Sequence, residues 1–219
     1  MNMVKISPSI LSTDFNKIEE TINSLNNTSC EYIHIDVMDG KFVPNKTFPI
    51  DLIKKVKKIS KKKLDVHLMI ESLEEKIKEY IEIKPEIITF HYEAAIKNNI
   101  YNLIKMIKKE KIKCGISIKP KTSVSEIKHL LKEIDLLLIM SVEPGKGGQE
   151  FIKFSLEKIK EAKKEIIKNN LDVLIEVDGG INNITAPLAI ESGADILVSG
   201  NYLLKQNNLE GAINSLRNK

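Results

Sequence analysis

The stretch YIHIDVMDG (residues 32–40) is an apolar run rich in β-branched residues that ends in a polar turn, as a buried β-strand does. Alternate side chains of a strand point to the same face, so His34, Asp36 and Met38 share one side of it. Burying an imidazole and a carboxylate there is costly unless other groups pair with them. The stretch therefore predicts a strand whose inward face carries a functional site.

The same arrangement recurs in two later stretches, LDVHLMI (64–70) and IEVDGG (175–180). His67 and Met69 share one face of the first, and Asp178 ends the apolar run of the second. A divalent cation is the simplest common partner for these polar groups, and a mixed nitrogen and oxygen set suits Zn²⁺, Fe²⁺, Mn²⁺ or Co²⁺. The candidate ligands of one such ion are His34, Asp36, His67 and Asp178.

The chain repeats one unit, which consists of a short apolar run, a turn and an amphipathic helix. The expected strands are residues 4–11, 32–38, 63–70, 86–92, 113–119, 136–142, 173–179 and 194–200. Alternating strands and helices imply a parallel sheet with helical crossovers, and eight such units favour closure into a single (β/α)8 TIM barrel. An open, doubly wound sheet is the alternative. No linker or change of composition marks a second domain, so residues 1–219 are expected to form one.

Helical patterns fill the gaps between the expected strands and are clearest at residues 72–83, 123–134, 155–170 and 208–216. Two of them open on a predicted capping box, formed by Ser72 with Glu75 and by Ser123 with Glu126. The third carries an apolar stripe made of Leu156, Ile159, Ala162, Ile166 and Ile167.

The polar candidates fall near the carboxyl ends of their strands, where the active sites of such barrels lie. A proton next to a carbonyl is very weakly acidic, and its removal needs a base within reach and stabilisation of the enolate oxygen. Asp36 and Asp178 would be able to take a proton from one face of a planar intermediate and return it to the other. Such a transfer inverts a carbon centre. The alternative is that both carboxylates only bind metal.

Other side chains also reach the expected barrel mouth. Three methionines either form a dry, polarisable wall against a flat intermediate or simply fill the core, namely Met38, Met69 and Met140. Ser9 either contacts substrate or is a plain turn residue. Supporting or loop roles are assigned to His91, Lys119 and Glu143.

Glycine-rich loops follow the last three expected strands, at residues 143–149, 178–180 and 199–201. Glycine lets backbone N–H groups approach an anion closely. A phosphate site built from the loops after strands seven and eight, with a short helix, recurs on this barrel, and NYLL (201–204) is expected to be that helix. Three adjacent loops therefore predict a site for a phosphate dianion.

Composition argues against several classes of function. The net charge is +4, but the basic run 54–63 is interleaved with apolar residues, as on a solvated helix face, and Arg217 is the single arginine. Cys30 and Cys114 lack metal-binding or redox spacing, which indicates a reduced, cytoplasmic protein. No secretory signal is recognisable, and no apolar run approaches the roughly 20 residues that cross a bilayer. Neither a nucleic acid nor a membrane is expected as a partner.

The chain resembles the ribulose-phosphate 3-epimerase family of the pentose phosphate pathways in segments that run in order from residue 7 to 200. These segments are SPSILSTDF, HIDVMDGKFVPN, DVHLMI, ITFHYE, MSVEPGKGGQEF, IEVDGGI and SGADILVSG. The resemblance implies a TIM barrel that interconverts D-ribulose 5-phosphate and D-xylulose 5-phosphate at C3, through a cis-enediolate and with one divalent metal ion. It also implies a homo-oligomer, either a dimer or a hexamer.

The resemblance further implies roles for individual residues. The metal ligands would be His34, Asp36, His67 and Asp178, of which Asp36 and Asp178 would also be the acid/base pair. Ser9 and His67 would touch substrate, and Met38, Met69 and Met140 would line the enediolate. The phosphate would be surrounded by Gly145, Gly147, Gly148, Gly179, Gly180, Gly200 and Asn201.

Four positions depart from the family pattern. Lys146 stands where Phe is usual, Asn201 where Ser is usual and Lys119 where Asn is common, and NKTFPI (45–50) replaces a stretch that contains Gly. Lys146 is counted among the candidate substrate-binding residues, because it either adds a cation near the phosphate or removes an apolar lid contact.

Three other functions are weighed against this one. D-Allulose 6-phosphate 3-epimerase, a related enzyme, would use the same residues on a six-carbon ketose. A sugar-phosphate-binding barrel without turnover would keep the loops but not exchange protons. A nucleic-acid binder would show affinity that falls steeply with salt.

Overall fold

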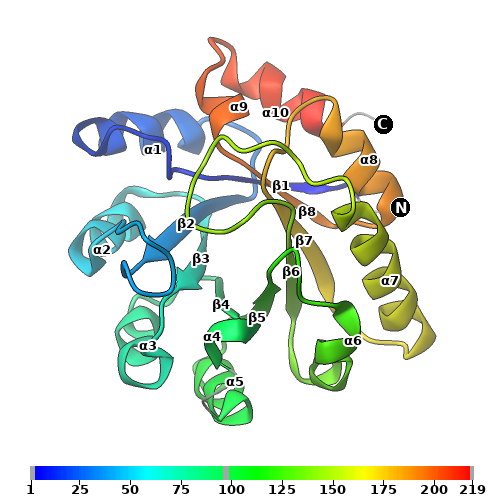
Figure 1. Ribbon diagram of the computed structural model, residues 1–219. Helices are drawn as coiled ribbons and strands as arrows, with labels where there is room; N and C mark the ends of the chain where they lie inside the picture. Colours follow the sequence, from blue (N-terminus) through cyan, green and yellow to red (C-terminus); the bar gives the residue numbers. More distant parts are fainter. Residues whose placement is uncertain (1–2, 96–98, 218–219) are drawn as a thin grey trace.

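The computed structural model describes residues 3–95 and 99–217. Within these residues eight parallel strands form a nearly closed barrel, and the helices surround it (Figure 1). The strands are β1 (Lys5–Pro8), β2 (Tyr32–Met38), β3 (Lys63–Met69), β4 (Ile87–His91), β5 (Lys113–Ile118), β6 (Leu136–Met140), β7 (Leu174–Asp178) and β8 (Ile196–Ser199). They lie within the ranges predicted from the sequence, and most are shorter by one to four residues.

The strands are hydrogen-bonded in the order β1-β8-β7-β6-β5-β4-β3-β2, so β1 and β2 are the two edges that meet. The seam between them is held by backbone hydrogen bonds from Ile10 N to His34 O (3.2 Å) and from Glu31 N to Ile6 O (3.2 Å). A parallel bridge between Ser9 and His34 completes the contact. The predicted TIM barrel is therefore confirmed, and the open sheet is excluded.

The helices occupy the predicted gaps between the strands. They are α1 (Ile18–Asn26), α2 (Ile50–Ile59), α3 (Leu73–Glu82), α4 (Tyr92–Ala95), α5 (Ile100–Lys109), α6 (Val124–Ile127), α7 (Ser155–Lys168), α8 (Thr185–Ser192), α9 (Asn201–Leu204) and α10 (Leu209–Arg217). Short 3-10 helices are η1 (Phe15–Lys17) and η2 (Lys128–Glu133). The short helix expected at residues 201–204 is confirmed as α9.

Three helical details differ from, or refine, the prediction. The helix expected at 123–134 is α-helical only as far as Ile127 and continues as a 3-10 helix. Its capping box is present, since the Glu126 carboxylate accepts a hydrogen bond from Ser123 N (3.0 Å). Within the described chain Ser72 makes no side-chain capping bond, because its backbone (φ −85°, ψ 61°) departs from the extended geometry that aims an N-cap side chain at the helix.

The apolar stripe of α7 is narrower than predicted. Ile159, Ala162 and Ile166 are buried against the barrel, but Ile167 is 69% exposed. Each residue of a helix turns by about 100°, so Ile167 lies a quarter-turn beyond Ile166 and faces away from the core.

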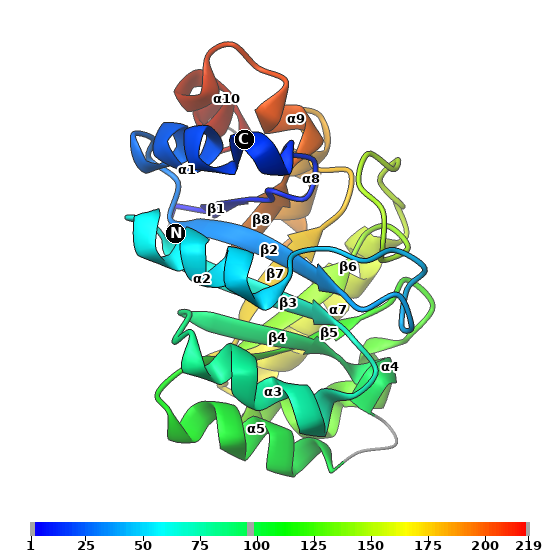
Figure 2. The same ribbon diagram turned by 90° about the vertical axis from the view of Figure 1, so that its left-hand side faces the viewer.

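The main hydrophobic core lies between the barrel and its helices, whereas part of the barrel interior is polar. Ser7, Asp65, Thr89, Ser117 and Glu176 have no exposed surface. Figure 2 shows the loops after β2 and β6 projecting beyond the carboxyl ends of the strands, on the side where the predicted site residues lie. In the described part of the chain, no helix has the length and apolar character that a membrane crossing requires.

Candidate functional site

Strand register brings the predicted residues to one level of the barrel. Between β2 and β3, Asp36 is paired with His67 and Met38 with Met69. Between β6 and β7, Met140 is paired with Asp178. Paired residues of parallel strands point to the same side of the sheet, so these side chains gather at the carboxyl end of the barrel.

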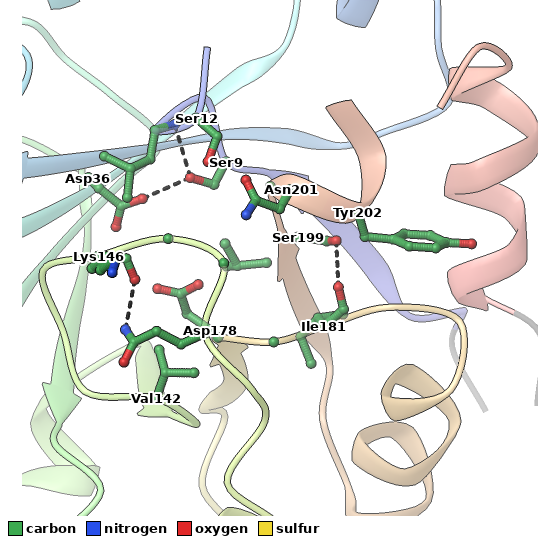
Figure 3. A pocket seen from close by; sticks show the side chains of 18 of the residues that line it. Ser9, Ser12, Asp36, Val142, Lys146, Asp178, Ile181, Ser199, Asn201 and Tyr202 are labelled. Carbon is green, nitrogen blue, oxygen red and sulfur yellow. Dashed lines mark hydrogen bonds between the residues drawn. The ribbon is translucent and has the colours of Figure 1, made fainter. Parts of the chain in front are cut away.

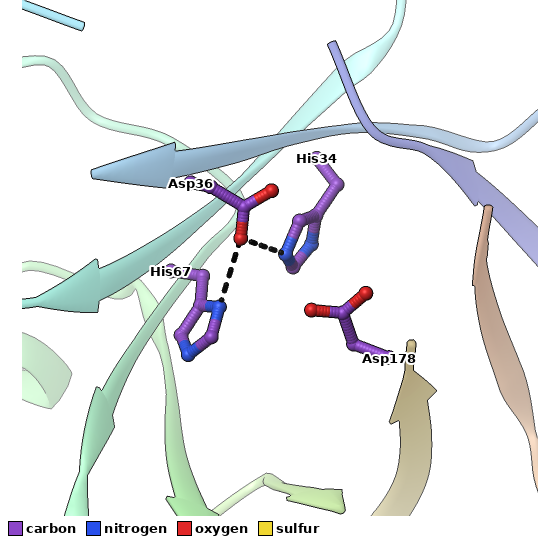
Figure 4. Close-up of side chains that lie close together, drawn as sticks. All are labelled: His34, Asp36, His67 and Asp178. Carbon is purple, nitrogen blue, oxygen red and sulfur yellow. Dashed lines mark hydrogen bonds and ion pairs between the residues drawn. The ribbon is translucent and has the colours of Figure 1, made fainter. Parts of the chain in front are cut away.

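His34, Asp36, His67 and Asp178 offer ligand atoms that all lie within 4.8 Å of one another (Figure 4). Asp36 Oδ1 is the centre of the group, 3.3 Å from His34 Nε2 and 3.1 Å from His67 Nδ1. His34 Nε2 is buried, and apart from this contact with Asp36 it has no hydrogen-bond partner among the described residues. Two imidazole nitrogens and two carboxylates gathered this closely fit a divalent cation, so the cluster is a candidate metal site.

Asp65, a buried carboxylate that the sequence analysis did not identify, contacts the ring nitrogen of His34 that points away from Asp36. His34 Nδ1 lies 2.5 Å from Asp65 Oδ2, which also accepts a hydrogen bond from the Ser7 hydroxyl (3.0 Å). Asp65 and Glu176 precede His67 and Asp178 by two residues. The period of two that placed His67 and Asp178 on the inward face would also have placed these two carboxyl groups.

The electrostatics of the cluster favour positive charge at its centre. Burial opposes the charged form of His34, but the negative charges of Asp65 and Asp36 outweigh it and hold the pKa of His34 well above its usual value. Burial alone would raise the pKa of Asp36. The positive charge of His34 and the close contacts of the His34 and His67 rings instead hold the pKa of Asp36 far below its usual range.

The pKa of Asp178 is shifted in the opposite direction to that of Asp36. Burial, and then the negative charge of Asp36, raise the pKa of Asp178 to about 7. Glu176 is also shifted upward, since burial and the charge of Asp65 hold its pKa well above the usual value. Two neighbouring carboxyl groups with pKa values pushed apart are the usual arrangement of an acid/base pair, here Asp36 and Asp178.

A second chain of polar groups runs outward from His67. His67 Nε2 lies 2.9 Å from His91 Nε2, and His91 Nδ1 lies 3.2 Å from Glu93 Oε2. Glu93 Oε1 accepts hydrogen bonds from Lys119 N (2.7 Å) and from the Thr122 hydroxyl. The sequence reasoning gave His91 and Lys119 supporting roles and did not identify Glu93.

The side chains of His91 and Glu93 differ in charge near pH 7. Burial lowers the pKa of His91 to about 4, so the ring is neutral near pH 7. Burial opposes ionisation of Glu93. Its hydrogen bond from His91 and the charge that this ring carries below its own pKa, followed by the bonds from Thr122 and Lys119, nevertheless lower the pKa of Glu93 to about 2. Glu93 is therefore a carboxylate held by donors on two sides.

A cavity of about 540 Å³ opens above the cluster (Figure 3). Asp36 and Asp178 both face it, and the Ser9 hydroxyl donates a hydrogen bond to Asp36 Oδ2 (2.8 Å). The predicted substrate-binding residues that line this cavity are Ser9, Met38, Met69, Met140, Gly145, Lys146, Gly147, Gly148, Gly179, Gly180, Gly200 and Asn201. His67 does not line it, because its ring is fully buried.

The loop after β6 crosses the barrel mouth (Figure 1). Gln149 stabilises this loop, since its side-chain amide donates hydrogen bonds to Glu143 O (2.7 Å) and to Lys146 O (2.7 Å). Gly180, in the loop after β7, has φ +65° and faces Phe151 so closely that a Cβ would lie 2.5 Å from Phe151 N. Glycine is therefore required there for both backbone conformation and space.

Comparison with known proteins identifies the relatives of this chain. Residues 5–204 match the model of the ribulose-phosphate 3-epimerase family. The chain is 42% identical over 216 residues to ribulose-phosphate 3-epimerase of Bacillus subtilis, covering 98% of this chain and 99% of the relative. It is 39% identical over 216 residues to the enzyme of the same name from Methanocaldococcus jannaschii, covering 98% and 90%.

A solved structure shares the fold at much lower identity. The crystal structure of KGPDC from Streptococcus mutans with a bound ligand superposes with a TM-score of 0.73 at 12% identity and covers 98% of this chain and 96% of that one. This likeness supports the barrel, and the family assignment rests on the sequence matches. The chain therefore belongs to the ribulose-phosphate 3-epimerase family, whose members are isomerases that act on carbohydrates.

Proposed function

We propose that this chain, acting as one domain, interconverts D-ribulose 5-phosphate and D-xylulose 5-phosphate by inverting C3. The observation that carries the proposal is the pair of carboxyl groups Asp36 and Asp178, which face one cavity beneath glycine-rich loops and have oppositely shifted pKa values. The family match and the relatives named above support the sugar-phosphate substrate.

The proposal includes one divalent cation, Zn²⁺, Fe²⁺, Mn²⁺ or Co²⁺. His34, Asp36, His67 and Asp178 would hold it, with His34 Nε2 and His67 Nδ1 as the nitrogen ligands because these atoms face Asp36. When bound, such a cation supplies Lewis-acid polarisation of the substrate oxygens next to C3.

The two aspartates carry the proton. One carboxylate takes the C3 proton, the electron pair passes into a cis-enediolate, and the other carboxylic acid returns a proton to the opposite face of C3. The Ser9 hydroxyl orients Asp36 through its hydrogen bond to Oδ2. An apolar wall limits competing hydrogen bonds to the flat intermediate, and it consists of Met38, Met69 and Met140.

We assign the substrate phosphate to the glycine-rich loops after β6, β7 and β8. Their backbone N–H groups suit a dianion, and Lys146 adds a positive charge at the same mouth. The residues assigned to this subsite are Gly145, Lys146, Gly147, Gly148, Gly179, Gly180, Gly200 and Asn201.

Gly180→Ala is expected to raise KM and to lower the free energy of unfolding by at least about 1 kcal/mol, since the new side chain must occupy left-handed backbone and displace Phe151 N. Gly193→Ala, at the end of α8 and outside the cavity lining, is the matched control, because its φ of +115° strains an alanine in the same way and should lower stability without changing KM. Steady-state kinetics and urea unfolding of both variants measure the difference. Equal KM values in the two variants would contradict the assigned phosphate loop.

Proton exchange at C3 tests the proposed reaction. The protein is incubated with ribulose 5-phosphate in D₂O, once after treatment with a chelator and once after reloading with Zn²⁺, and C3 is followed by NMR. We expect deuterium at C3 and formation of xylulose 5-phosphate only in the reloaded sample. Absence of deuterium in both would favour a binding barrel without turnover, and a higher kcat/KM for allulose 6-phosphate would favour that epimerase.

The proposal also includes a homo-oligomer, either a dimer or a hexamer. Sedimentation velocity measures which of the two forms.

A further inference from the structure

We propose that Glu93 and His91 are positioning residues that fix the proton of His67 on Nε2, so that His67 Nδ1 presents a lone pair to the divalent cation. This inference rests on the metal part of the proposed function. It concerns residues outside the four candidate ligands and the cavity wall.

The geometry forms one continuous line from the β5–α6 loop to the centre of the barrel. Glu93 Oε1 is held by Lys119 N (2.7 Å) and Thr122, which leaves Oε2 facing His91 Nδ1 at 3.2 Å. His91 Nε2 then faces His67 Nε2 at 2.9 Å. The other ring nitrogen of His67, Nδ1, faces Asp36 (Figure 4).

Donor and acceptor matching sets the direction of every bond in this line. A carboxylate is an acceptor only, so His91 must place its proton on Nδ1. A neutral imidazole then has an acceptor at Nε2, and this acceptor requires the proton of His67 to be on Nε2. His67 Nδ1 is thereby left with a free lone pair, although it lies 3.1 Å from the oxygen of a carboxylate, Asp36 Oδ1. Such a contact between two acceptors is favourable only with a cation between them.

His34 shows the same arrangement in its direct form. Its Nδ1 lies 2.5 Å from Asp65 Oδ2, which leaves Nε2 as the nitrogen that faces Asp36. Each imidazole ligand is therefore backed by a carboxylate, through one contact for His34 and through His91 for His67. A carboxylate behind a metal-bound histidine fixes its tautomer and raises its basicity as a ligand.

Replacing Glu93 by Gln makes a sharp test because the amide has only one favourable orientation. Lys119 N and the Thr122 hydroxyl are both donors, so the Gln carbonyl oxygen must take the place of Oε1. The amide NH₂ would then donate to His91 Nδ1. The proton of His91 would move to Nε2 and be donated to His67 Nε2, so donor and acceptor exchange places in each hydrogen bond from residue 93 to His67. A proton is placed on His67 Nδ1, where the cation must bind.

We expect Glu93→Gln to weaken Zn²⁺ binding by about 100-fold and Glu93→Ala, which imposes no reversed direction, by about 10-fold. Zn²⁺ affinity is measured by competition with a chromophoric chelator. Glu82→Gln, at an exposed position of α3 away from the cavity, is the matched control and should bind Zn²⁺ as the wild type does. Equal affinities of the wild type and Glu93→Gln, or weaker binding by Glu93→Ala than by Glu93→Gln, would overturn the inference.

Nitrogen-15 NMR of the histidine rings gives a second readout that a merely structural role would not move. In the Zn²⁺-loaded wild type, His91 should carry its proton on Nδ1, and in metal-free Glu93→Gln it should carry it on Nε2. A proton on His91 Nε2 in the loaded wild type would refute the relay. Neither measurement uses a sugar, so failure of the proposed reaction and failure of this inference are separable: the first appears only in the deuterium exchange, the second only in Zn²⁺ affinity and ring tautomers.

Discussion

Asp178→Asn is expected to reduce kcat for the interconversion of ribulose 5-phosphate and xylulose 5-phosphate by about 10²–10⁴-fold, the usual contribution of a positioned acid or base. Asparagine keeps the shape and an oxygen that faces the cavity, but it cannot carry the proton. The pKa of Asp178, raised to about 7 by burial and by the charge of Asp36, makes this carboxyl group suited to both giving and taking a proton near neutral pH. A coupled assay at saturating Zn²⁺ measures kcat.

Asp172→Asn is the control for this change. Asp172 is an exposed residue just before β7, at the opposite end of the barrel from Asp178, so the same loss of charge should leave kcat unaltered. If Asp178→Asn kept more than about a tenth of the wild-type kcat, the loss would be only ~1.4 kcal/mol of barrier and its assigned role would be wrong.

Asp36→Asn is expected to abolish epimerisation to a similar degree while keeping solvent exchange from one of the two epimers. Because the two carboxyl groups are proposed to serve opposite faces of C3, each asparagine variant retains the base for one epimer only. Asp36→Asn and Asp178→Asn should therefore exchange the C3 proton of opposite substrates in D₂O. NMR of the recovered sugar phosphates, taken separately from ribulose 5-phosphate and xylulose 5-phosphate, measures this.

The pattern of exchange decides between two roles for the aspartates. Exchange from the same epimer in both variants would mean that a single base serves both directions. Loss of exchange from both epimers in both variants, at saturating Zn²⁺, would mean that the two carboxylates act only as metal ligands. The first outcome leaves an epimerase with a different proton path, whereas the second removes the acid/base pair altogether.

Much of the fold could be predicted from local patterns of apolar residues in the sequence. The apolar runs around His34, His67 and Asp178 predicted strands that the structure confirms, and the alternation of strands with helices predicted the barrel. These signals are local: a strand repeats every two residues and a helix about every 3.6, so neighbouring residues suffice to reveal them. The same locality explains the errors. Ile167 fits an apolar stripe by type, but its exposure depends on where the rotation of α7 directs it.

The contacts within the site could be predicted from the sequence only in part. Asp65 and Glu176 had a signal in the period of two and were overlooked because a lone acidic residue in a strand is not distinctive. Glu93 had no such signal, since its role comes from contacts with His91 at the end of β4 and with Lys119 and Thr122 in the loop after β5.

Backbone geometry and hydrophobic periodicity act over a few residues, so the order of the amino acids is enough to predict which face of its own strand or helix each side chain occupies. Which side chains then meet depends on contacts between segments that are far apart in the chain. Strand register and the closure of β1 onto β2 depend on packing of the whole barrel. They bring Asp36 within 3.1 Å of His67 Nδ1 and within 2.8 Å of the Ser9 hydroxyl, and they align Glu93 with His67 through His91.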